Sequence, residues 1–504
     1  MNNQLNTPSS YSAHKERPTF KKVALVHAPI DPQYQDASQH YAPPLGLVCL
    51  KTALEAGADG VGVTILDGTQ MPQENILARI EKNPPDLVGV SVQQVTYGNS
   101  LDIAAKAKAV GAEVVFGGHH ATQLAREMME NQHYLVDAVV SNDGEIPLRL
   151  IAQGFDFRDI PNLTFWDDGV IQNAVTEFAL DQFLPPDYSG LDLIPYAERY
   201  SKRLGWSEPR IFLRTNSHKG CGNRFNSNAC YFCGRADKSV RFKSPAKFVQ
   251  ELTKLKQRWG ASEVFDVGDD IAFRDEWLRE TAERIEAEGL ELPLGCFGRA
   301  ARLRNAGTAR LLLRMGVSSV IIGFESGDPT LLSRCGKGTI TPQDNLVAAR
   351  NLFDLGIDTV ASYVIGLPGE NESSLRRTYD NAANLVAVAK RHLGRAPYEL
   401  VANLFEPSPG SPAFCRMKQV FPMKYLGQDR LDLATCQADY FRAHWGFVTD
   451  EEVEGFRQLL VRWGTRINAL ITEADCQGFR VDEVKVRVFA PTMPRSAEQP
   501  VLTS

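Results

Sequence analysis

The sequence has no long apolar run, no excess of basic residues and no apolar segment near its N-terminus. Apolar stretches such as VSSVIIGF (317–324) are far shorter than the roughly 20 residues needed to span a bilayer. The first twenty residues are polar, which argues against a secretory signal. A net charge of −6 provides no basic field for nucleic acid. We therefore expect a cytoplasmic protein without membrane or nucleic-acid partners.

Cysteine is also sparse, with nine residues in 504, and six of them stand far apart: Cys49, Cys296, Cys335, Cys415, Cys436 and Cys476. The other three lie together in KGCGNRFNSNACYFCGR (219–235). In this stretch eight residues separate Cys221 from Cys230, and two separate Cys230 from Cys233. Thiols stay reduced in the cytoplasm, so the cluster indicates a metal site or a redox pair rather than a structural disulfide.

Residues 20–154 alternate short apolar segments with amphipathic ones. We expect strands at 22–27, 61–68, 86–93, 113–118 and 137–145, with helices between them. This alternation predicts a doubly wound parallel sheet of the Rossmann or flavodoxin-like kind, which binds ligands at the carboxyl ends of its strands. The segments FGGHHAT (116–122) and SNDGE (141–145) fall at such ends.

A second alternating series covers residues 209–405. We expect strands at 210–216, 263–269, 292–300, 318–326, 358–366 and 398–405. Six βα-like units in succession predict a parallel barrel, either full or partial; the partial form is a (β/α)6 barrel. Its chemistry is expected at the carboxyl ends of the strands. The three cysteines directly follow the first of these strands, so they fall at that catalytic face.

The remaining segments are expected to be accessory. Residues 1–19 form a disordered tail, and 155–208, rich in Pro and Asp, form a linker with a short β excursion. Residues 406–504 form a small, mostly helical C-terminal domain with a possible final strand at 483–489. The fold class expected is therefore α/β, with two parallel units followed by a helical domain.

The cysteine cluster has two readings from its residues alone. His218 upstream would complete four zinc ligands, H-x2-C-x8-C-x2-C, in a zinc-stabilised binding protein without enzymatic activity. However, structural zinc sites usually bring a second ligand pair from farther along the chain, and no second CxxC is present. Three thiolates without an obvious fourth suit a 4Fe–4S cluster with one iron left open to bind an amino acid.

Four further segments follow the cysteines in order and fall at predicted strand ends: FDVGDD (265–270), GCFGRA (295–300), IIGFESGDP (321–329) and SYVIGLPGE (362–370). With the cysteine loop, they resemble the radical SAM superfamily. In that superfamily three loop cysteines ligate a 4Fe–4S cluster that reductively cleaves S-adenosylmethionine to a 5′-deoxyadenosyl radical. The usual spacing is C-x3-C-x2-C. Here the first gap is longer, whereas the CYFC half, with an aromatic before the last cysteine, is typical.

The resemblance implies that Cys221, Cys230 and Cys233 bind the cluster and that S-adenosylmethionine lies at the strand ends. Its amino group is expected at Asp269 and Asp270, and its carboxylate at Arg299, whose guanidinium can bind it bidentately. Glu325 and Ser326 are the implied contacts to the ribose or the amino group, and Gly366 and Gly369 are those to the adenine. Phe232, beside the cluster, is also implied to contact S-adenosylmethionine.

A doubly wound domain before such a barrel resembles the cobalamin-binding subgroup, over about residues 20–410. The resemblance implies that a corrin rests on the strand ends, with Ser91, Gly117, Gly118 and His119 near its nucleotide tail. The DxHxxG motif is absent, so no histidine ligand to cobalt is predicted. The alternative is a structural cap that binds no cofactor.

The function implied is that of a cobalamin-dependent radical SAM enzyme, most often a C-methyltransferase in this subgroup. It would act on a small metabolite or natural-product intermediate and take electrons from a donor such as flavodoxin or ferredoxin. A radical rearrangement or cyclisation, with or without cobalamin, is the other enzymatic possibility.

Overall fold

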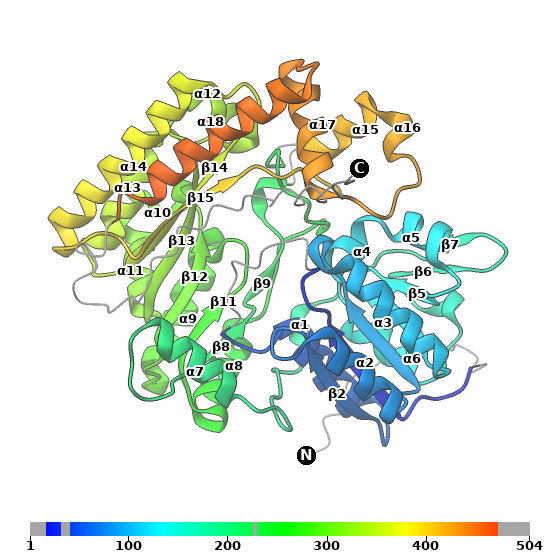
Figure 1. Ribbon diagram of the computed structural model, residues 1–504. Helices are drawn as coiled ribbons and strands as arrows, with labels where there is room; N and C mark the ends of the chain where they lie inside the picture. Colours follow the sequence, from blue (N-terminus) through cyan, green and yellow to red (C-terminus); the bar gives the residue numbers. More distant parts are fainter. Residues whose placement is uncertain (1–16, 32–40, 225–228, 472–504) are drawn as a thin grey trace, which may run out of the picture.

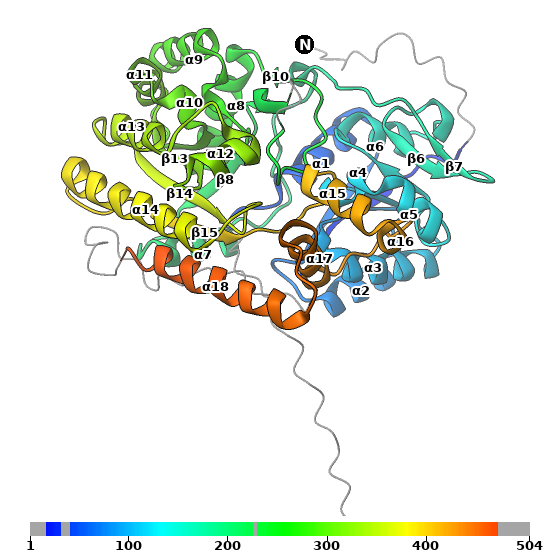
Figure 2. The same ribbon diagram turned by 90° about the horizontal axis from the view of Figure 1, so that it is seen from above.

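Two β-sheets, the first mainly and the second entirely parallel, are each covered by helices and form the two halves of the molecule (Figures 1 and 2). The computed structural model describes residues 17–31, 41–224 and 229–471. Most of the expected tail and the possible final strand at 483–489 therefore lie outside the described residues. Among the helices that are described, none is both long and apolar enough to cross a bilayer.

The first sheet has the strand order β2-β1-β3-β4-β5-β6-β7. Its strands are β1 (Lys22–His27), β2 (Gly62–Asp67), β3 (Leu87–Ser91), β4 (Glu113–Gly117), β5 (Ala138–Val140), β6 (Leu163–Trp166) and β7 (Val170–Gln172). The pairings from β1 to β5 are parallel, which is the flavodoxin-like arrangement. The expected β excursion is the hairpin β6–β7, which pairs antiparallel with β5 and thereby extends this sheet.

Helices cover both faces of this sheet: α1 (Leu45–Gly57), α2 (Gln73–Lys82), α3 (Tyr97–Ala109), α4 (His119–Gln123), α5 (Ala125–Gln132) and α6 (Glu145–Ala152). The loops that connect β4 to α4 and β5 to α6 lie at the carboxyl edge of the sheet. The segments FGGHHAT and SNDGE span these two connections, as the sequence predicts.

The second sheet has six strands, all parallel, in the order β15-β14-β13-β12-β11-β8. They are β8 (Ile211–Thr215), β11 (Ala261–Asp266), β12 (Leu294–Gly298), β13 (Val317–Glu325), β14 (Asp358–Ile365) and β15 (Glu399–Leu404). The main helices between them are α8 (Pro245–Trp259), α9 (Asp275–Glu288), α11 (Ala306–Arg314), α13 (Pro342–Phe353) and α14 (Glu372–Leu393). Chain order and strand order agree, as in an open (β/α)6 barrel, and the predicted fold class is confirmed.

Helices outside the two sheets join the halves. The linker segment contains α7 (Ile194–Arg203), which the sequence analysis did not predict and which packs against β8. The C-terminal region contains α15 (Pro412–Val420), α16 (Pro422–Tyr425), α17 (Leu433–Trp445) and α18 (Asp450–Asn468). In both ribbon views α15 and α16 lie over α4 and α5 of the first half, whereas α18 runs along α14 of the second.

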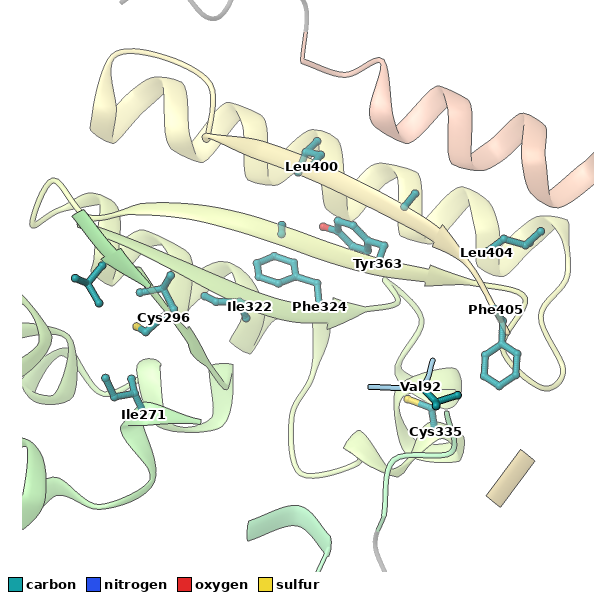
Figure 3. Packing of buried hydrophobic residues seen from close by; sticks show 14 of the residues in the cluster. Val92, Ile271, Cys296, Ile322, Phe324, Cys335, Tyr363, Leu400, Leu404 and Phe405 are labelled. Atoms are coloured by element: carbon teal, nitrogen blue, oxygen red, sulfur yellow. The ribbon is translucent and has the colours of Figure 1, made fainter. Parts of the chain in front are cut away.

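The main hydrophobic core is continuous between the two halves. Val92, which follows β3, Cys335 of the barrel half and Phe405, which follows β15, belong to this one cluster, and Figure 3 labels all three. All three are fully or almost fully buried. Polar contacts add to this junction, because the Tyr97 hydroxyl and the Gln132 amide both donate to the Asp429 carboxylate, at 2.5 and 2.8 Å. The two carboxyl edges are therefore held against each other.

Candidate functional site

The cysteine loop begins and ends in a short two-stranded stem. Beyond β8, strands β9 (His218–Lys219) and β10 (Arg241–Phe242) pair antiparallel, with Arg241 opposite Lys219. Gly220 follows the stem with a φ of +87°, and a Cβ there would lie 2.0 Å from the Ser239 carbonyl oxygen. Glycine is thus required where the two arms of the loop come together. The cysteines project from this stem at the carboxyl edge of the second sheet.

Two side chains from the long gap of the loop contact the cysteine sulfurs. The Asn223 amide donates to Cys230 Sγ at 3.3 Å, and Arg224 Nη2 donates to Cys233 Sγ at 3.0 Å. Burial raises the pKa of the Cys221 and Cys230 thiols, so their surroundings do not by themselves hold them as thiolates. A soft, positively charged iron–sulfur core would do so. The donor set of three thiols with hydrogen-bond donors nearby fits such a cluster.

His218 is not available as a fourth ligand, which removes the zinc reading. Its Nε2 accepts the backbone N–H of Asp270 at 2.8 Å, and its Nδ1 lies 2.8 Å from the Ser217 hydroxyl. Both ring nitrogens are therefore engaged, and the ring is stacked on Phe242 in the interior. In the described part of the chain, no three His, Cys, Asp or Glu side chains converge as a single ion requires.

A cavity of about 310 Å³ lies beside the cysteine loop and contains two of the predicted S-adenosylmethionine contacts. It is lined by Asn223, Asp270 and Arg299, among others. The buried Asp270 carboxylate accepts the backbone N–H of Arg299 at 3.3 Å, and burial raises its pKa to about 6. The Arg299 guanidinium donates to the Asn223 side chain at 2.9 Å. A carboxylate and a guanidinium at one cavity match the amine and carboxylate of an amino acid.

Asp269 and Phe232 are not in the lining of this cavity and have other contacts. Asp269 pairs with Arg235 of the cysteine loop, with 3.0 Å between Oδ1 and Nη2. Phe232 is half-buried and packs against the main core. Their roles toward S-adenosylmethionine stay predictions.

The predicted ribose contacts, Glu325 and Ser326, are both buried. Glu325 ends β13 with a φ of +57°, which is rare for a residue with a side chain, and its carboxylate lies 2.8 Å from Lys337 Nζ. The Ser326 hydroxyl lies 3.2 Å from the Thr378 hydroxyl of α14 and accepts the backbone N–H of Asp328. Both side chains thus have partners within the fold, and their roles toward S-adenosylmethionine stay predictions.

The predicted adenine segment, GLPGE (366–370), turns sharply after β14. Gly366 and Gly369 have φ values of +101° and +85°, so glycine is required at both positions. The Gly366 backbone N–H donates to Glu370, and its carbonyl accepts the Tyr440 hydroxyl of α17 at 2.9 Å. The turn is therefore anchored to the C-terminal helices.

We expect Glu370 to make stability depend on pH. Burial raises its pKa to about 8, from 4.5 in an unfolded chain, and its Oε1 has no hydrogen-bond partner among the described residues. The folded state thus retains a proton that the unfolded chain releases. The protonated Glu370 therefore contributes to the free energy of unfolding. This contribution is complete below pH 4.5 and is lost as pH rises through 8, by about 1.4 kcal/mol per pH unit. Urea unfolding between pH 5.5 and 8.5 should show this decline in the wild type and a flatter profile in Glu370→Gln. Parallel profiles would contradict it.

A second cavity, of about 170 Å³, lies at the carboxyl edge of the first sheet. Its lining includes Gly46, Leu47, Ser91, Gly117, Gly118 and Lys219. Gly118 has a φ of +93°, and a Cβ there would come within 2.9 Å of the Val92 carbonyl oxygen, so the backbone forms this wall without side chains. An apolar cavity of about 150 Å³ holds a benzene-sized ring. This cavity, whose lining also includes Glu145 and Lys219, is therefore large enough to hold an aromatic ring.

The two carboxyl edges meet at the cysteine loop. The Gln123 side chain of α4 donates to the Gly234 carbonyl at 2.6 Å, and Arg235 Nη1 lies 3.3 Å from His119 Nε2. His119 is exposed at the rim of the first sheet, whereas the buried His120 contacts the Asp429 carbonyl oxygen through its Nε2. The structure thus separates the two adjacent histidines, and only His119 faces the loop.

Several residues with direct contacts to the site escaped the sequence analysis: Asn223, Arg224, Lys219, Asp143 and Lys337. The signal for the first two was present, because CGNRFNSNAC places polar side chains inside an unusually long gap between ligands. Lys219 flanks the first cysteine. Nothing local marks Lys337, which ends the helical turn Ser333–Lys337 and reaches Glu325 at the end of β13.

Comparisons with known proteins agree with this geometry. Residues 36–152 match the model of the B12 binding domain, and residues 215–382 match that of the Radical SAM superfamily. An uncharacterized methyltransferase of Pyrococcus horikoshii is 26% identical, over 72% of this chain and 78% of the relative. The bacteriochlorophyllide d C-12(1)-methyltransferase of Chlorobaculum tepidum is 25% identical, over 84% of each chain. The solved structure of the radical S-adenosylmethionine methyltransferase TsrM from Kitasatospora setae, with cobalamin and a [4Fe-4S] cluster bound, has the same fold. Its TM-score is 0.66 at 19% identity, covering 96% of this chain and 93% of that one.

Proposed function

The chain belongs to the cobalamin-binding branch of the radical SAM superfamily, and from this we propose that it transfers a methyl group to an unactivated carbon. The substrate class that we propose is a small metabolite or natural-product intermediate, and the proposed electron donor is a flavodoxin or ferredoxin. The family uses a 4Fe–4S cluster, S-adenosylmethionine and cobalamin. When bound, these groups supply the radical chemistry and the methyl carrier.

The observation that carries the proposal is that the carboxyl edges of the two sheets face each other across the cysteine loop. The contacts from Gln123 to Gly234 and from Arg235 to His119 join these edges directly. Groups held at the two edges would therefore be close to one substrate. Bringing bound reactants together in this way is a major contribution that a protein makes to catalysis. The methyltransferase relatives support methyl transfer.

In this proposal each part of the site has a distinct task. Cys221, Cys230 and Cys233 bind the cluster, while Asn223 and Arg224 donate hydrogen bonds to two of the sulfurs. Asp270 and Arg299 orient the amino-acid end of S-adenosylmethionine at the cavity beside the loop. The cavity lined by Ser91, Gly117 and Gly118 receives the cobalamin tail.

We expect anaerobic protein loaded with iron, sulfide and cobalamin to cleave S-adenosylmethionine when a reductant is added. A methyl transfer that uses the radical gives both 5′-deoxyadenosine and S-adenosylhomocysteine, measured by liquid chromatography with mass detection. Deuterium from methyl-labelled S-adenosylmethionine should appear in the product when candidate substrates are screened. A rearrangement or cyclisation would instead give 5′-deoxyadenosine without S-adenosylhomocysteine, and would overturn the methyl-transfer proposal.

A further inference from the structure

One carboxylate of the first half binds both strands of the cysteine-loop stem. Asp143 follows β5 and is almost fully buried. Its Oδ1 accepts Lys219 Nζ at 2.6 Å, and its Oδ2 accepts Arg241 Nη1 at 2.5 Å. Lys219 lies on β9 and Arg241 directly opposite on β10. Figure 1 shows β9 between the two halves of the molecule. A single side chain of the first half therefore closes the stem from which the cysteines project.

The two cations have further partners, but none of those partners reaches both strands. Arg241 also donates to the Phe178 carbonyl at 2.7 Å and lies 3.4 Å from Asp237. Lys219 Nζ lies 3.8 Å from Glu145, beyond a normal hydrogen bond. Asp143 is thus the charged group that bridges the two strands, beside the stacking of His218 on Phe242 across the same stem. Removing its charge leaves two part-buried cations close together with weaker partners, which is unfavourable.

Lys219 also borders the cavity assigned to the cobalamin tail. That cavity is lined by Lys219 together with Ser91, Gly118 and Glu145. Along the chain, only Gly220 separates Lys219 from Cys221. The same lysine therefore lies against the cavity on one side, against Asp143 on another, and beside a cluster ligand in sequence.

We propose that Asp143 is a positioning residue that couples occupation of this cavity to the placement of the cysteine loop. A group in the cavity packs against Lys219 and keeps its ammonium on Asp143, so the stem stays closed and the cluster is retained. By linkage, a placed cluster loop strengthens binding in the cavity to the same degree. The identity of the two bound groups rests on the function proposed above, whereas the coupling rests on the ion pairs described here.

The test is the rate at which a chelator removes iron from cluster-loaded protein, with and without saturating hydroxocobalamin. In the wild type we expect cobalamin to slow iron release about fivefold, in line with typical coupling between sites. In Asp143→Asn the ratio of the release rate without hydroxocobalamin to the rate with it should fall to about one. Iron release should also be faster than in the wild type under both conditions. Glu127→Gln is the matched control, because it breaks another ion pair between the halves, with Lys418 at 3.1 Å, that does not touch the cysteine loop.

A second variant keeps the proposal testable if Asp143→Asn does not fold. Lys219→Gln leaves the Asp143–Arg241 pair in place and removes only the cation at the cavity, and it should also bring the ratio to about one. A wild-type ratio in both variants, or no effect of cobalamin on the wild type, would overturn the coupling. Neither result depends on turnover, so a failure of methyl transfer is seen separately in the product assay.

Discussion

Iron content is expected to fall from about four atoms per chain to background when Cys230 or Cys233 is replaced by alanine. Each substitution removes one of the three thiolates that we assign as the protein ligands of the cluster. With the cluster lost, cleavage of S-adenosylmethionine should be abolished. The measurement is elemental analysis of iron, cobalt and zinc in protein purified anaerobically from cells supplied with cobalamin, where the wild type should also carry up to one cobalt.

Cys221→Ala tests the part of the assignment that departs from the usual spacing. We expect the same loss of iron, since the stem places Cys221 directly after Gly220 at the start of the loop. The control is Cys415→Ala, which removes an exposed thiol on α15 and should leave iron unchanged. Retention of about four irons in Cys221→Ala would show that another residue is the third ligand. About one zinc and no iron in the wild type would contradict the cluster altogether.

Lys337→Met should destabilise the barrel half by about 3–5 kcal/mol, because it leaves the Glu325 carboxylate buried and unpaired. Both side chains of this pair are more than 90% buried, with 2.8 Å between the charged atoms. The free energy of unfolding can be measured by urea denaturation of metal-free protein. The control is Arg284→Met, whose pair with Glu280 is exposed on α9 and should contribute less than about 1 kcal/mol.

The double variant Glu325→Gln/Lys337→Met separates the structural role of this pair from ligand binding. It removes both charges, so most of the lost stability should return. If Glu325 also contacts S-adenosylmethionine, the stable double variant should still bind that ligand more weakly than the wild type. Wild-type affinity in the double variant would limit Glu325 to a structural role, and equal stability of Lys337→Met and the wild type would contradict the buried-pair argument.

The two sheets were predictable because their signals are local. Parallel strands that are covered on both faces are continuous apolar runs, and the helices between them carry amphipathic periodicity. The strand order of the barrel half then follows chain order. The B12-binding match bears out the cobalamin-binding domain and sets aside the alternative of a cofactor-free cap. By contrast, α7 and the pairing of the β6–β7 hairpin onto β5 were not predicted, because an edge strand accepts a partner from any segment that reaches it.

The candidate site likewise has one part that the sequence predicts and another that depends on the tertiary structure. The sequence by itself determined the three cysteines, their position after the first barrel strand, and the acidic, basic and glycine-rich segments at the following strand ends, since spacing and residue type carry that chemistry. Only the tertiary structure decided that both nitrogens of His218 are engaged, that the partners of Ser326 belong to the fold, and that Asp143 meets Lys219 and Arg241. The contacts of His218 with Asp270, of Ser326 with Thr378 and of Asp143 with Arg241 join residues 52, 52 and 98 positions apart, and their energies depend on burial. No local pattern encodes either property, because both arise only when segments distant in the sequence pack together in the folded chain.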